Sequence, residues 1–475
     1  MSGLPSSPER DINVTVRAQD GSWRDRFRYI IEAVRCHPLA TFLLAALLIS
    51  LPLVLNPGYF SHDELQWLAL ADREHWNELP WQGWFDFRPF QFRPLTFNTW
   101  LVLSAVVGYQ PLLMHAVVVG LGLFNAWLLR SCMVGGGVRI TIATGAALLF
   151  LLSPSVMQVH GWVGTIGDLY CLMAALLGVR VLQRHPGRSM EITCIVALTI
   201  LALLSKESAL VFPVLLLAAW PQRRWSLWLP VTASFAIVMI YLALRWQTIL
   251  YTPRSDGHYA WSLMNIPSRL LDYAAFPFVP NLFETHVIRL HESAWRWVLG
   301  LGLCGGLLLL VLRTGWRALL ALVFGWIACL GPILLLGAST SVYAYLASAW
   351  AFAACAWAWQ ASSVLSRRLM LGIAVVVSLH GLLIGERIIQ IGVLQHGVFA
   401  SIEQLLPTAT YAAPLRLSAA QRRDQAALAR MFHDVPSWRR IPLDGRVVIV
   451  TAGDSPNFIV APDGSLRTSE TDAEH

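Results

Sequence analysis

Residues 38–56 have the sequence PLATFLLAALLISLPLVLN, an apolar run without a charged side chain. About 20 such residues are enough for a helix to cross the hydrocarbon core of a bilayer. Similar runs recur along the 475 residues, of which 56% are hydrophobic and only 13% charged, with a mean hydropathy of +0.56. A soluble domain has about 25% charged residues. Because a chain inside lipid must satisfy its backbone hydrogen bonds internally, these runs predict an all-α polytopic membrane protein.

We expect about eleven membrane-spanning helices, which together make up a transmembrane domain at 38–386. Their predicted ranges are 38–56, 111–130, 139–154, 166–183, 190–205, 207–221, 226–245, 294–312, 317–336, 342–360 and 369–386.

The short loops between these ranges divide by charge into two sets. One set contains Arg130, Arg139, Arg180, Arg184, Arg188, Arg223, Arg224, Arg313, Arg317, Arg367 and Arg368. The other set, at 155–165, 205–207 and 337–341, contains a single basic residue, Lys206. Since basic loops stay on the cytoplasmic side, this asymmetry predicts the orientation. We expect a multi-pass protein of a bacterial inner membrane, with a cytoplasmic tail at 1–37 that lacks a cleavable signal peptide and a periplasmic C-terminus.

Three longer segments then face outward, at 57–110, 246–293 and 387–475. The apolar part of the first segment, at 95–108, is too short to span and predicts an interfacial helix that lies on the membrane. The last segment contains an apolar β-like run at 446–450 and Gly-Asp turn signals. It predicts a small α/β appendage after the last span.

The charge and cysteine content exclude several classes of protein. The net charge of +7 comes without a basic stripe on a soluble face, which argues against nucleic-acid binding. The seven cysteines lie in or beside predicted spans, so we do not expect a disulfide framework. The sequence has neither a phosphate-binding glycine loop nor a zinc pattern of His and Cys. The oligomeric state is left open.

A pair of acids follows the first span, in Ser61-His62-Asp63-Glu64-Leu65. Two adjacent carboxylates at the edge of a membrane domain are costly to desolvate, so they are candidates for chemistry. The alternative is an acid pair that is simply solvated at a helix end.

Two Arg-Pro steps lie in the same outward segment, Arg88-Pro89 and Arg93-Pro94. The guanidinium of Arg has a permanent charge and a fork of donors, which suits it to holding a phosphate. The alternative is an arginine that reaches to the membrane interface along its aliphatic stem.

Lys206-Glu207 separates two apolar runs, and Lys206 is the only lysine in the chain. Burying an ion at membrane depth costs at least about 2.5–3.5 kcal/mol, and an adjacent acid and base would lower that cost. The pair therefore indicates a site-lining position, or else an exposed hairpin tip.

The order of these motifs resembles the C-class (GT-C) integral-membrane glycosyltransferases, which use polyprenyl-phosphate sugars and include protein O-mannosyltransferases and lipid A aminoarabinose transferases. The resemblance covers about 38–350. The residues that carry it are, in chain order, Asp63 and Glu64, Arg93 and Pro94, Pro111 and His115, Pro154, Trp162 and Asp168, Lys206 and Glu207, and Tyr343 and Tyr345. The chain departs from the family pattern at Val156, Gln158, Ile166 and Val342, where relatives have His, Glu, Arg and Arg.

The resemblance implies an inverting transfer of a sugar from a polyprenyl-phosphate donor to a periplasmic, lipid or glycan acceptor. Asp63 would act as base for the acceptor hydroxyl with Glu64 beside it, and Arg93, with Arg88 or Lys206, would bind the donor phosphate. The site-lining residues would be Asp168, Glu207, Tyr343 and Tyr345. No cofactor is assigned and no metal ligand is named, although an Asp-Glu pair also suits a divalent cation.

Two other functions stay open. A transporter or flippase would place charges near the bilayer midplane in repeated halves, whereas here the acids gather at one face and no internal repeat is visible. An O-antigen-ligase-like enzyme would use outward arginines and a His, without an early Asp-Glu pair. Apart from the donor, the expected partners are membrane lipids. The sequence leaves the sugar and the acceptor open.

Overall fold

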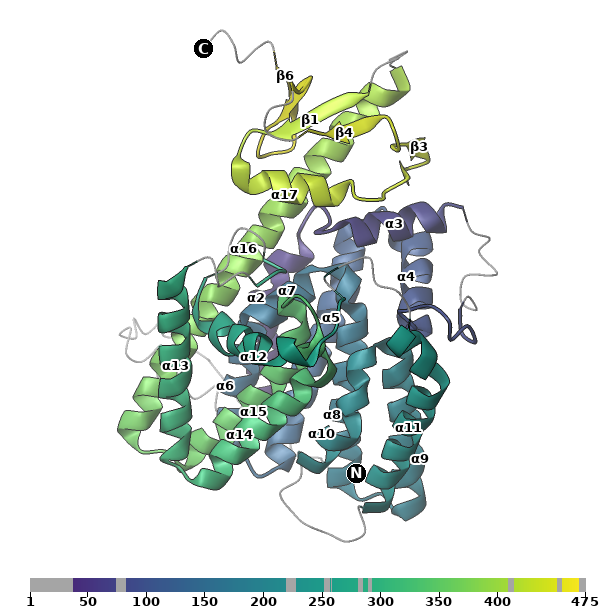
Figure 1. Cartoon of the computed structure of the whole chain (residues 1–475). Helices are drawn as coiled ribbons and strands as arrows, with labels where there is room; N and C mark the ends of the chain where they lie inside the picture. Colours follow the sequence, from purple (N-terminus) through teal and green to yellow (C-terminus); the bar gives the residue numbers. More distant parts are fainter. Residues whose placement is uncertain are drawn as a thin grey trace, which may run out of the picture.

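The computed structural model describes residues 37–73, 83–218, 228–251, 257, 259–280, 285–288, 293–408, 414–450 and 455–469. Long helices run alongside one another and form the body of the molecule (Figure 1). They are α2 (Pro38–Val54), α5 (Pro111–Gly135), α6 (Ile140–Leu151), α8 (Ile166–Arg184), α9 (Arg188–Ser205), α11 (Trp228–Tyr251), α13 (Ala294–Leu312), α14 (Trp316–Leu330), α15 (Tyr345–Ala361) and α16 (Val364–Thr408).

Shorter elements connect these helices. The short α-helices are α3 (His62–Ala71), α4 (Pro94–Val107), α7 (Pro154–Gly161), α10 (Phe212–Ala218), α12 (Ile266–Ala275) and α17 (Arg422–Met431). The 3-10 turns are η2 (Val163–Thr165), η3 (Glu207–Val211), η5 (Leu263–Asn265), η6 (Phe276–Phe278), η8 (Gly331–Leu335) and η9 (Ser341–Ala344).

Eight helices of the described part are long and apolar enough to cross a membrane, or up to nine if one bent pair is counted as a span. The shorter apolar helices Pro38–Val54, Pro94–Val107 and Glu207–Leu216 fall below that length. The prediction of a helical, multi-pass membrane protein is therefore confirmed.

The bent pair is α6 and α7, whose axes differ by 62°. Ser153 and Pro154 lie at the break. Proline fits the first turn of a new helix but not the interior of a continuing one, so Pro154 favours a restart in a new direction. All eight residues of α7 are buried. After the bend, α7 ends at Trp162, and the next residue, Val163, begins η2 and contacts Glu64 of α3.

The segment after the first span forms α3 and α4. Figure 1 shows α3 across the upper end of the bundle, while α4 runs alongside the long helices. The interfacial position predicted for 95–108 stays a prediction, and α4 is a short apolar helix packed against the bundle. Polar side chains hold α4 there, because Thr96 donates to the carbonyl of Ser205 at 2.8 Å and the Trp100 indole donates to that of Val163 at 3.1 Å.

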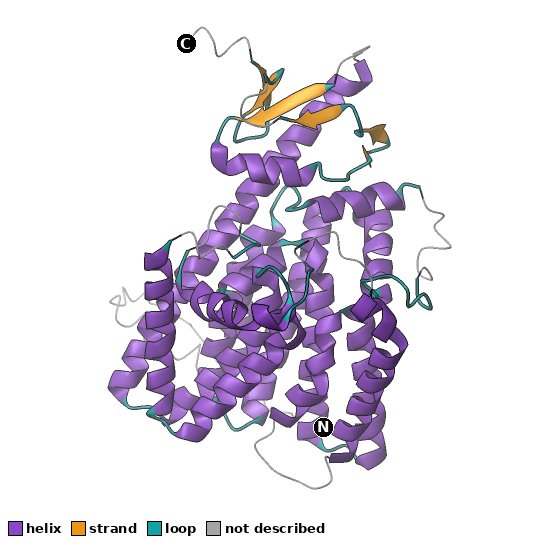
Figure 2. Cartoon of the chain, in the orientation of Figure 1, coloured by secondary structure: helices purple, strands orange, loops and turns teal. Residues whose placement is uncertain are grey.

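Helix α16 continues without a break through residue 387, where the sequence predicts the end of the membrane domain. Its distal part leads into a four-stranded sheet, and Figure 2 shows the strands gathered at this end of the molecule. The strand order is β4-β1-β5-β6, with β1 parallel to β4 and β5, and β5 antiparallel to β6. The strands are β1 (Leu415–Ala419), β4 (Val447–Ile449), β5 (Phe458–Val460) and β6 (Leu466–Thr468), and β2 (Ser437–Trp438) pairs separately with β3 (Ile441–Pro442).

We call residues 414–469 of the described chain the C-terminal domain. Its helix α17 is joined to α16 by an ion pair between Arg387 and Asp424 at 2.7 Å. The C-terminal domain also contacts α3, because the side-chain amide of Gln66 donates to the carbonyl of His433 at 3.0 Å. The C-terminal domain therefore lies over the end of the bundle at which α3 is found (Figure 1).

Candidate functional site

Glu64 is built into the start of α3. Its Oε2 accepts from the backbone N–H of Ser61 at 3.1 Å, and its Oε1 accepts from the N–H of Val163 at 3.1 Å. The residue is 3% exposed. An acid at the third helical position that reaches back to the N-cap stabilises the first turn. Glu64 thus ties α3 to η2 of the membrane domain.

Asp63 points elsewhere. Its side chain is 31% exposed, and Oδ1 lies 3.3 Å from Nε2 of His62. Although the side chain reaches solvent, enough protein surrounds it that desolvation raises the pKa of Asp63 above its usual value, against the opposing effects of His62, Arg430 and Arg93. The two predicted catalytic acids therefore have different surroundings, and of the two only Asp63 reaches solvent.

The neighbouring acids influence each other. Burial, followed by the charge of Asp63, raises the pKa of Glu64 from 4.5 to about 8. Burial also lowers the pKa of His62. At neutral pH these shifts favour a protonated Glu64 and an uncharged His62.

Arg93 is the N-cap residue of α4, and Pro94 is the first residue of that helix. Its Nε donates to Oε2 of Glu207 at 2.7 Å, with the two side chains 17% and 26% exposed. Glu207 begins η3, so this ion pair joins the first outward segment to the end of α9. Arg93 also lowers the pKa of Asp63, which places it within electrostatic range of that carboxylate.

A second arginine, Arg245 of α11, shares Glu207. Its Nη1 lies 3.8 Å from Oε1 of Glu207, and the side chain is fully buried. Nη2 donates to the carbonyls of Pro89 at 2.8 Å and Phe90 at 2.7 Å. Arg245 was not among the predicted site residues. The available signal was an arginine at the end of the apolar run 226–245, because an ionisable residue at membrane depth indicates a functional position.

Lys206 pairs with Asp168 rather than with its neighbour Glu207. Nζ donates to Oδ2 of Asp168 at 2.5 Å and lies 4.9 Å from the ring centre of Tyr343. Lys206 is 7% exposed, which excludes the exposed hairpin tip. The adjacent acid and base thus belong to two separate ion pairs, and Asp168, at the start of α8, joins the site through Lys206.

Tyr343 belongs to this group, and Tyr345 does not. Tyr343 is hydrogen-bonded to Tyr259 and lies near Arg93, and Gln91 donates to the Tyr259 hydroxyl at 3.0 Å. The Tyr345 hydroxyl instead accepts from the Asn125 amide at 3.3 Å and lies 3.2 Å from His160, inside the helix bundle. Tyr345 is therefore held within the bundle by Asn125 and His160, in electrostatic range of Asp168 but not beside Arg93.

Arg88 is also outside the site. Its guanidinium pairs with Asp86 at 2.8 Å, and the Arg88 side chain is 91% exposed. The prediction that Arg88 joins Arg93 is not supported by this placement.

The charges of these buried and half-buried side chains do not cancel. Three cations, Arg93, Arg245 and Lys206, face two anions, Glu207 and Asp168, so the group has one excess positive charge. We call these five residues the ion-pair group. Buried ions are stable when each has partners, and a net positive group in a low dielectric attracts an anion.

No group of three or more His, Cys, Asp or Glu side chains in the described chain is arranged to hold a metal ion. Both carboxylate oxygens of Glu64 already accept backbone N–H groups.

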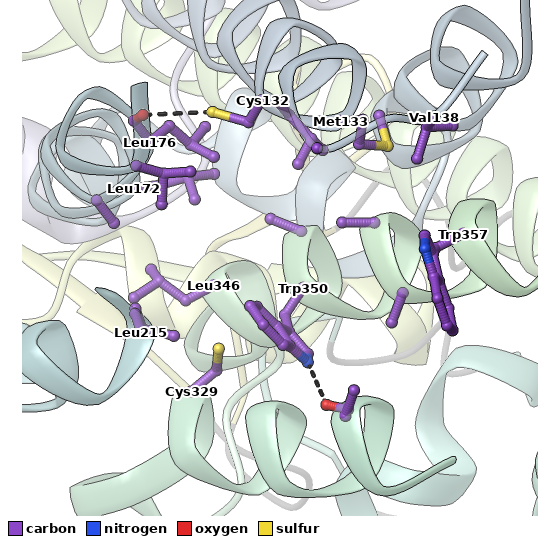
Figure 3. Close-up of a pocket in the computed structure, with 18 of the residues that line it drawn as sticks. Cys132, Met133, Val138, Leu172, Leu176, Leu215, Cys329, Leu346, Trp350 and Trp357 are labelled. Carbon is purple, nitrogen blue, oxygen red and sulfur yellow. Dashed lines mark hydrogen bonds between the residues drawn. The ribbon is translucent and has the colours of Figure 1, made fainter. Parts of the chain in front are cut away.

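Cavities lie among the helices of the described chain, and two of them are large. One, of about 300 Å³, is lined by apolar side chains that include Leu172, Leu215 and Leu346, with Trp350 donating to the carbonyl of Ala321 at 2.9 Å (Figure 3). The other, of about 540 Å³, is also mainly apolar. No predicted site residue lines either cavity, so neither marks the charged site.

No protein-family model, curated protein or solved structure matches this chain.

Proposed function

We propose that this chain is an integral-membrane glycosyltransferase of the C class, which moves a sugar from a polyprenyl-phosphate donor to an acceptor hydroxyl with inversion at the anomeric carbon. The proposal rests on the order of the sequence motifs together with the geometry around α3. A periplasmic protein, a lipid or a glycan is the acceptor class in this proposal.

The observation that carries the proposal is the proximity of one solvent-reaching carboxylate to the partly buried ion-pair group, whose five side chains carry one excess positive charge. Asp63 comes from α3, and the ion-pair group comes from the start of α4, the start of α8, the end of α9 and α11. Arg93 lies within electrostatic range of Asp63. A base and an anion-binding group close together are the two functions that this transfer requires.

In the proposed reaction Asp63 takes the proton of the acceptor hydroxyl. The acceptor oxygen forms a bond to the anomeric carbon as the bond from that carbon to the phosphate oxygen breaks. The electron pair leaves with the polyprenyl phosphate, and direct displacement inverts the anomeric centre. Because charge grows on the departing phosphate, a fixed cation there stabilises the transition state more than the ground state.

Arg93 is the assigned phosphate ligand. Glu207 accepts from its Nε, and a guanidinium has four further N–H donors on its two terminal nitrogens. The ion pair can therefore orient Arg93 while those terminal donors meet a phosphate. Lys206 and Arg245 supply the remaining positive charge from positions that are more deeply buried.

The proposal includes about eleven spans in a bacterial inner membrane, with the N-terminus cytoplasmic and the site facing the periplasm. The arginine-rich loops support this orientation. Two of the shorter apolar helices, α2 and the η3–α10 segment, occupy ranges in which the sequence predicts spans.

A lipid or glycan transporter is the second candidate, because the 62° break between α6 and α7 is the kind of broken helix at which transporters bind their cargo. The ionisable residues of the candidate site, however, lie on other elements, and α7 itself contains only His160 as a titratable residue. The glycosyltransferase proposal gives a role to Asp63 and to the ion-pair group, whereas the transporter proposal does not.

Lipid extraction from a strain that lacks this chain tests the proposal. We expect a glycosylated polyprenyl phosphate to accumulate, and one envelope component to lose the mass of the same sugar. Re-expression of the wild-type chain should reverse both changes. A strain with unchanged polyprenyl-phosphate lipids and unchanged envelope glycans would contradict the transferase.

A further inference from the structure

The cavity of about 540 Å³ is a slot that runs along helix α6. Thr141, Gly145, Leu149 and Ser153 line it, and because they recur at every fourth position they follow one face of this helix. A helix rises about 1.5 Å per residue, so the stretch from Thr141 to Ser153 is about 18 Å long. The length and the volume fit a long, narrow ligand.

Apolar side chains form most of the walls of this slot. Leu308 of α13, Val323 of α14, Phe352 of α15 and Ala374 of α16 complete it, and none of its lining residues in the described chain is charged. Water in a cavity needs about two to four polar partners, of which these walls offer few. Helices α6 and α13 lie on the opposite side of the bundle from α9 and α11 (Figure 1). The slot therefore suits a hydrocarbon chain and is separate from the ion-pair group.

The slot reaches the surface of the bundle. Leu371 of α16 and Thr141 at the start of α6 both line it, and both residues are exposed. They lie at the same end of the slot, because the backbone N–H of Arg139 donates at 2.8 Å to the side chain of Gln360, just before α16. Since α16 contains a stretch long and apolar enough to cross a membrane, this surface faces lipid, and a chain from the bilayer can enter from the side.

A buried polar group lies at the other end of the slot. Ser153 is 2% exposed, and its hydroxyl has no hydrogen-bond partner among the described residues. The residue is the N-cap of α7, but its side chain makes no capping bond. A buried hydroxyl without a partner costs free energy, so a ligand that supplies an acceptor here would gain a hydrogen bond.

We propose that the slot binds one acyl chain of a membrane glycerophospholipid, whose ester carbonyl accepts a hydrogen bond from Ser153. A carbonyl oxygen only accepts, so it matches a hydroxyl that needs an acceptor. A phosphate group would not match the slot, because no cation lines it in the part of the chain that the structure describes. The hydrocarbon core of a bilayer is about 30 Å thick, so a chain of one leaflet, about 15 Å long, fills most of the slot. The binding of this lipid does not depend on the proposed sugar transfer.

Gly145 offers a way to close the slot without disturbing its walls. A Cβ added at Gly145 would meet no other described part of the protein within 4 Å, and leucine is favoured over glycine inside a helix. Gly145→Leu should therefore fold and place its side chain in the slot. Gly120 of α5 is the matched control, because a Cβ there also meets nothing described within 4 Å and the residue does not line the slot.

The test is photo-crosslinking of the purified full-length chain in detergent with a phosphatidylethanolamine that carries a diazirine in one acyl chain. Fragment mass spectrometry locates the adducts. We expect adducts on Leu149 and Phe352 in the wild type and in Gly120→Leu, and a loss of about tenfold or more in Gly145→Leu. Adducts on Leu244, which is 57% exposed on α11, should be equal in the three proteins and calibrate the labelling.

Ser153→Ala tests the hydrogen bond to the lipid. The probe concentration that half-saturates the Leu149 and Phe352 adducts should rise by about fivefold, while thermal unfolding without lipid should match the wild type, because the hydroxyl has no partner to lose among the described residues. Unlabelled phosphatidylethanolamine should displace the probe more strongly than polyprenyl phosphate at the same concentration. Equal adducts in Gly145→Leu and the wild type, an unchanged half-saturation in Ser153→Ala, or stronger displacement by polyprenyl phosphate would each overturn the proposal. Since no sugar takes part in the measurement, its result is independent of whether the chain is a glycosyltransferase.

Discussion

Arg93 and Arg88 each precede a proline in the same outward segment, but their side chains have opposite surroundings. Arg93 is 17% exposed and held by Glu207, while Arg88 is 91% exposed and bound to Asp86. An exposed ion pair contributes little, whereas a half-buried one beside further ions is part of a fixed geometry. The difference makes Arg88 a natural control for Arg93.

We expect Arg93→Lys to lower turnover measurably, because lysine keeps the charge but loses the planar fork that can meet Glu207 and a phosphate together. Arg93→Ala should be worse, with the loss mainly in kcat. Arg88→Lys should leave kcat unchanged. Steady-state rates of sugar transfer in purified protein measure all three. If Arg93→Lys and Arg88→Lys behave alike, Arg93 only reaches to the membrane interface.

Glu64 should make stability depend on pH. Its pKa in the folded chain is raised to about 8 from an unfolded value near 4.5, so the folded state binds the proton more tightly. The stabilisation is complete below the unfolded value and is lost as the pH rises towards 8. We therefore expect the apparent Tm to fall between about pH 5 and pH 8 by more in the wild type than in Glu64→Gln. Equal slopes in the two proteins would refute the assignment.

The sequence predicts the acid pair, but it does not predict that Glu64 is buried against backbone N–H groups while Asp63 reaches solvent. The partner that occupies Glu64 is the backbone N–H of Val163, 99 positions along the chain. Likewise, Lys206 and Glu207 are adjacent, yet Lys206 pairs with Asp168 and Glu207 with Arg93. Local patterns indicate which residues are charged at membrane depth, and tertiary packing decides how they pair.

At the scale of elements, Arg245 fixes the segment before α4 to α11. Arg245→Met keeps much of the volume but removes the donors to the Pro89 and Phe90 carbonyls. Leaving these groups without partners should cost about 2–4 kcal/mol of stability and lower turnover through Arg93. Tyr241→Phe removes only one hydrogen bond to Arg245 and should cost about 1 kcal/mol. Thermal unfolding in detergent compares the stabilities of the two variants. An Arg245→Met protein as stable as the wild type would contradict this anchoring role.

The orientation of the helices is tested by labelling from one side. Arg73 follows α3, and Ser189 lies at the start of α9; both are exposed. A membrane-impermeant thiol reagent on intact spheroplasts should label Arg73→Cys above the background of the parent protein and leave Ser189→Cys unlabelled. After lysis both should react. The reverse pattern in intact cells would overturn the orientation and with it the periplasmic site.

Hydropathy predicts spans well because each span depends on its own side chains, and each of the long apolar helices overlaps a predicted range. Hydropathy does not predict the end of a helix that continues beyond its apolar stretch, as α16 does. Beyond residue 386 the hydropathy drops, but Ile391, Leu394, Val398 and Ile402 keep one face of α16 buried. The helical period continues, so the helix does too. The position of α4 depends on hydrogen bonds to Ser205 and Val163, which hydropathy does not register.

At the scale of the whole molecule, the C-terminal domain and the membrane domain meet at α3. Tyr109 donates to Asp72 at 2.6 Å and accepts from the backbone N–H of Arg439 at 3.2 Å, and Arg439 in turn lies 3.1 Å from Glu403 of α16. Turn and strand patterns predict a small folded unit near the C-terminus, but its docking partner depends on contacts between residues far apart in the chain.

The most direct test of the account compares Asp63→Asn with the wild type in the strain that lacks this chain. Asparagine keeps the shape of the side chain but cannot take the acceptor proton, so transfer should fall by about 100-fold or more. Measurement of the glycosylated polyprenyl phosphate should show it cleared by the wild type and by Arg88→Gln, and retained with Asp63→Asn at equal protein level. Clearance by Asp63→Asn at the wild-type rate would contradict Asp63 as the base.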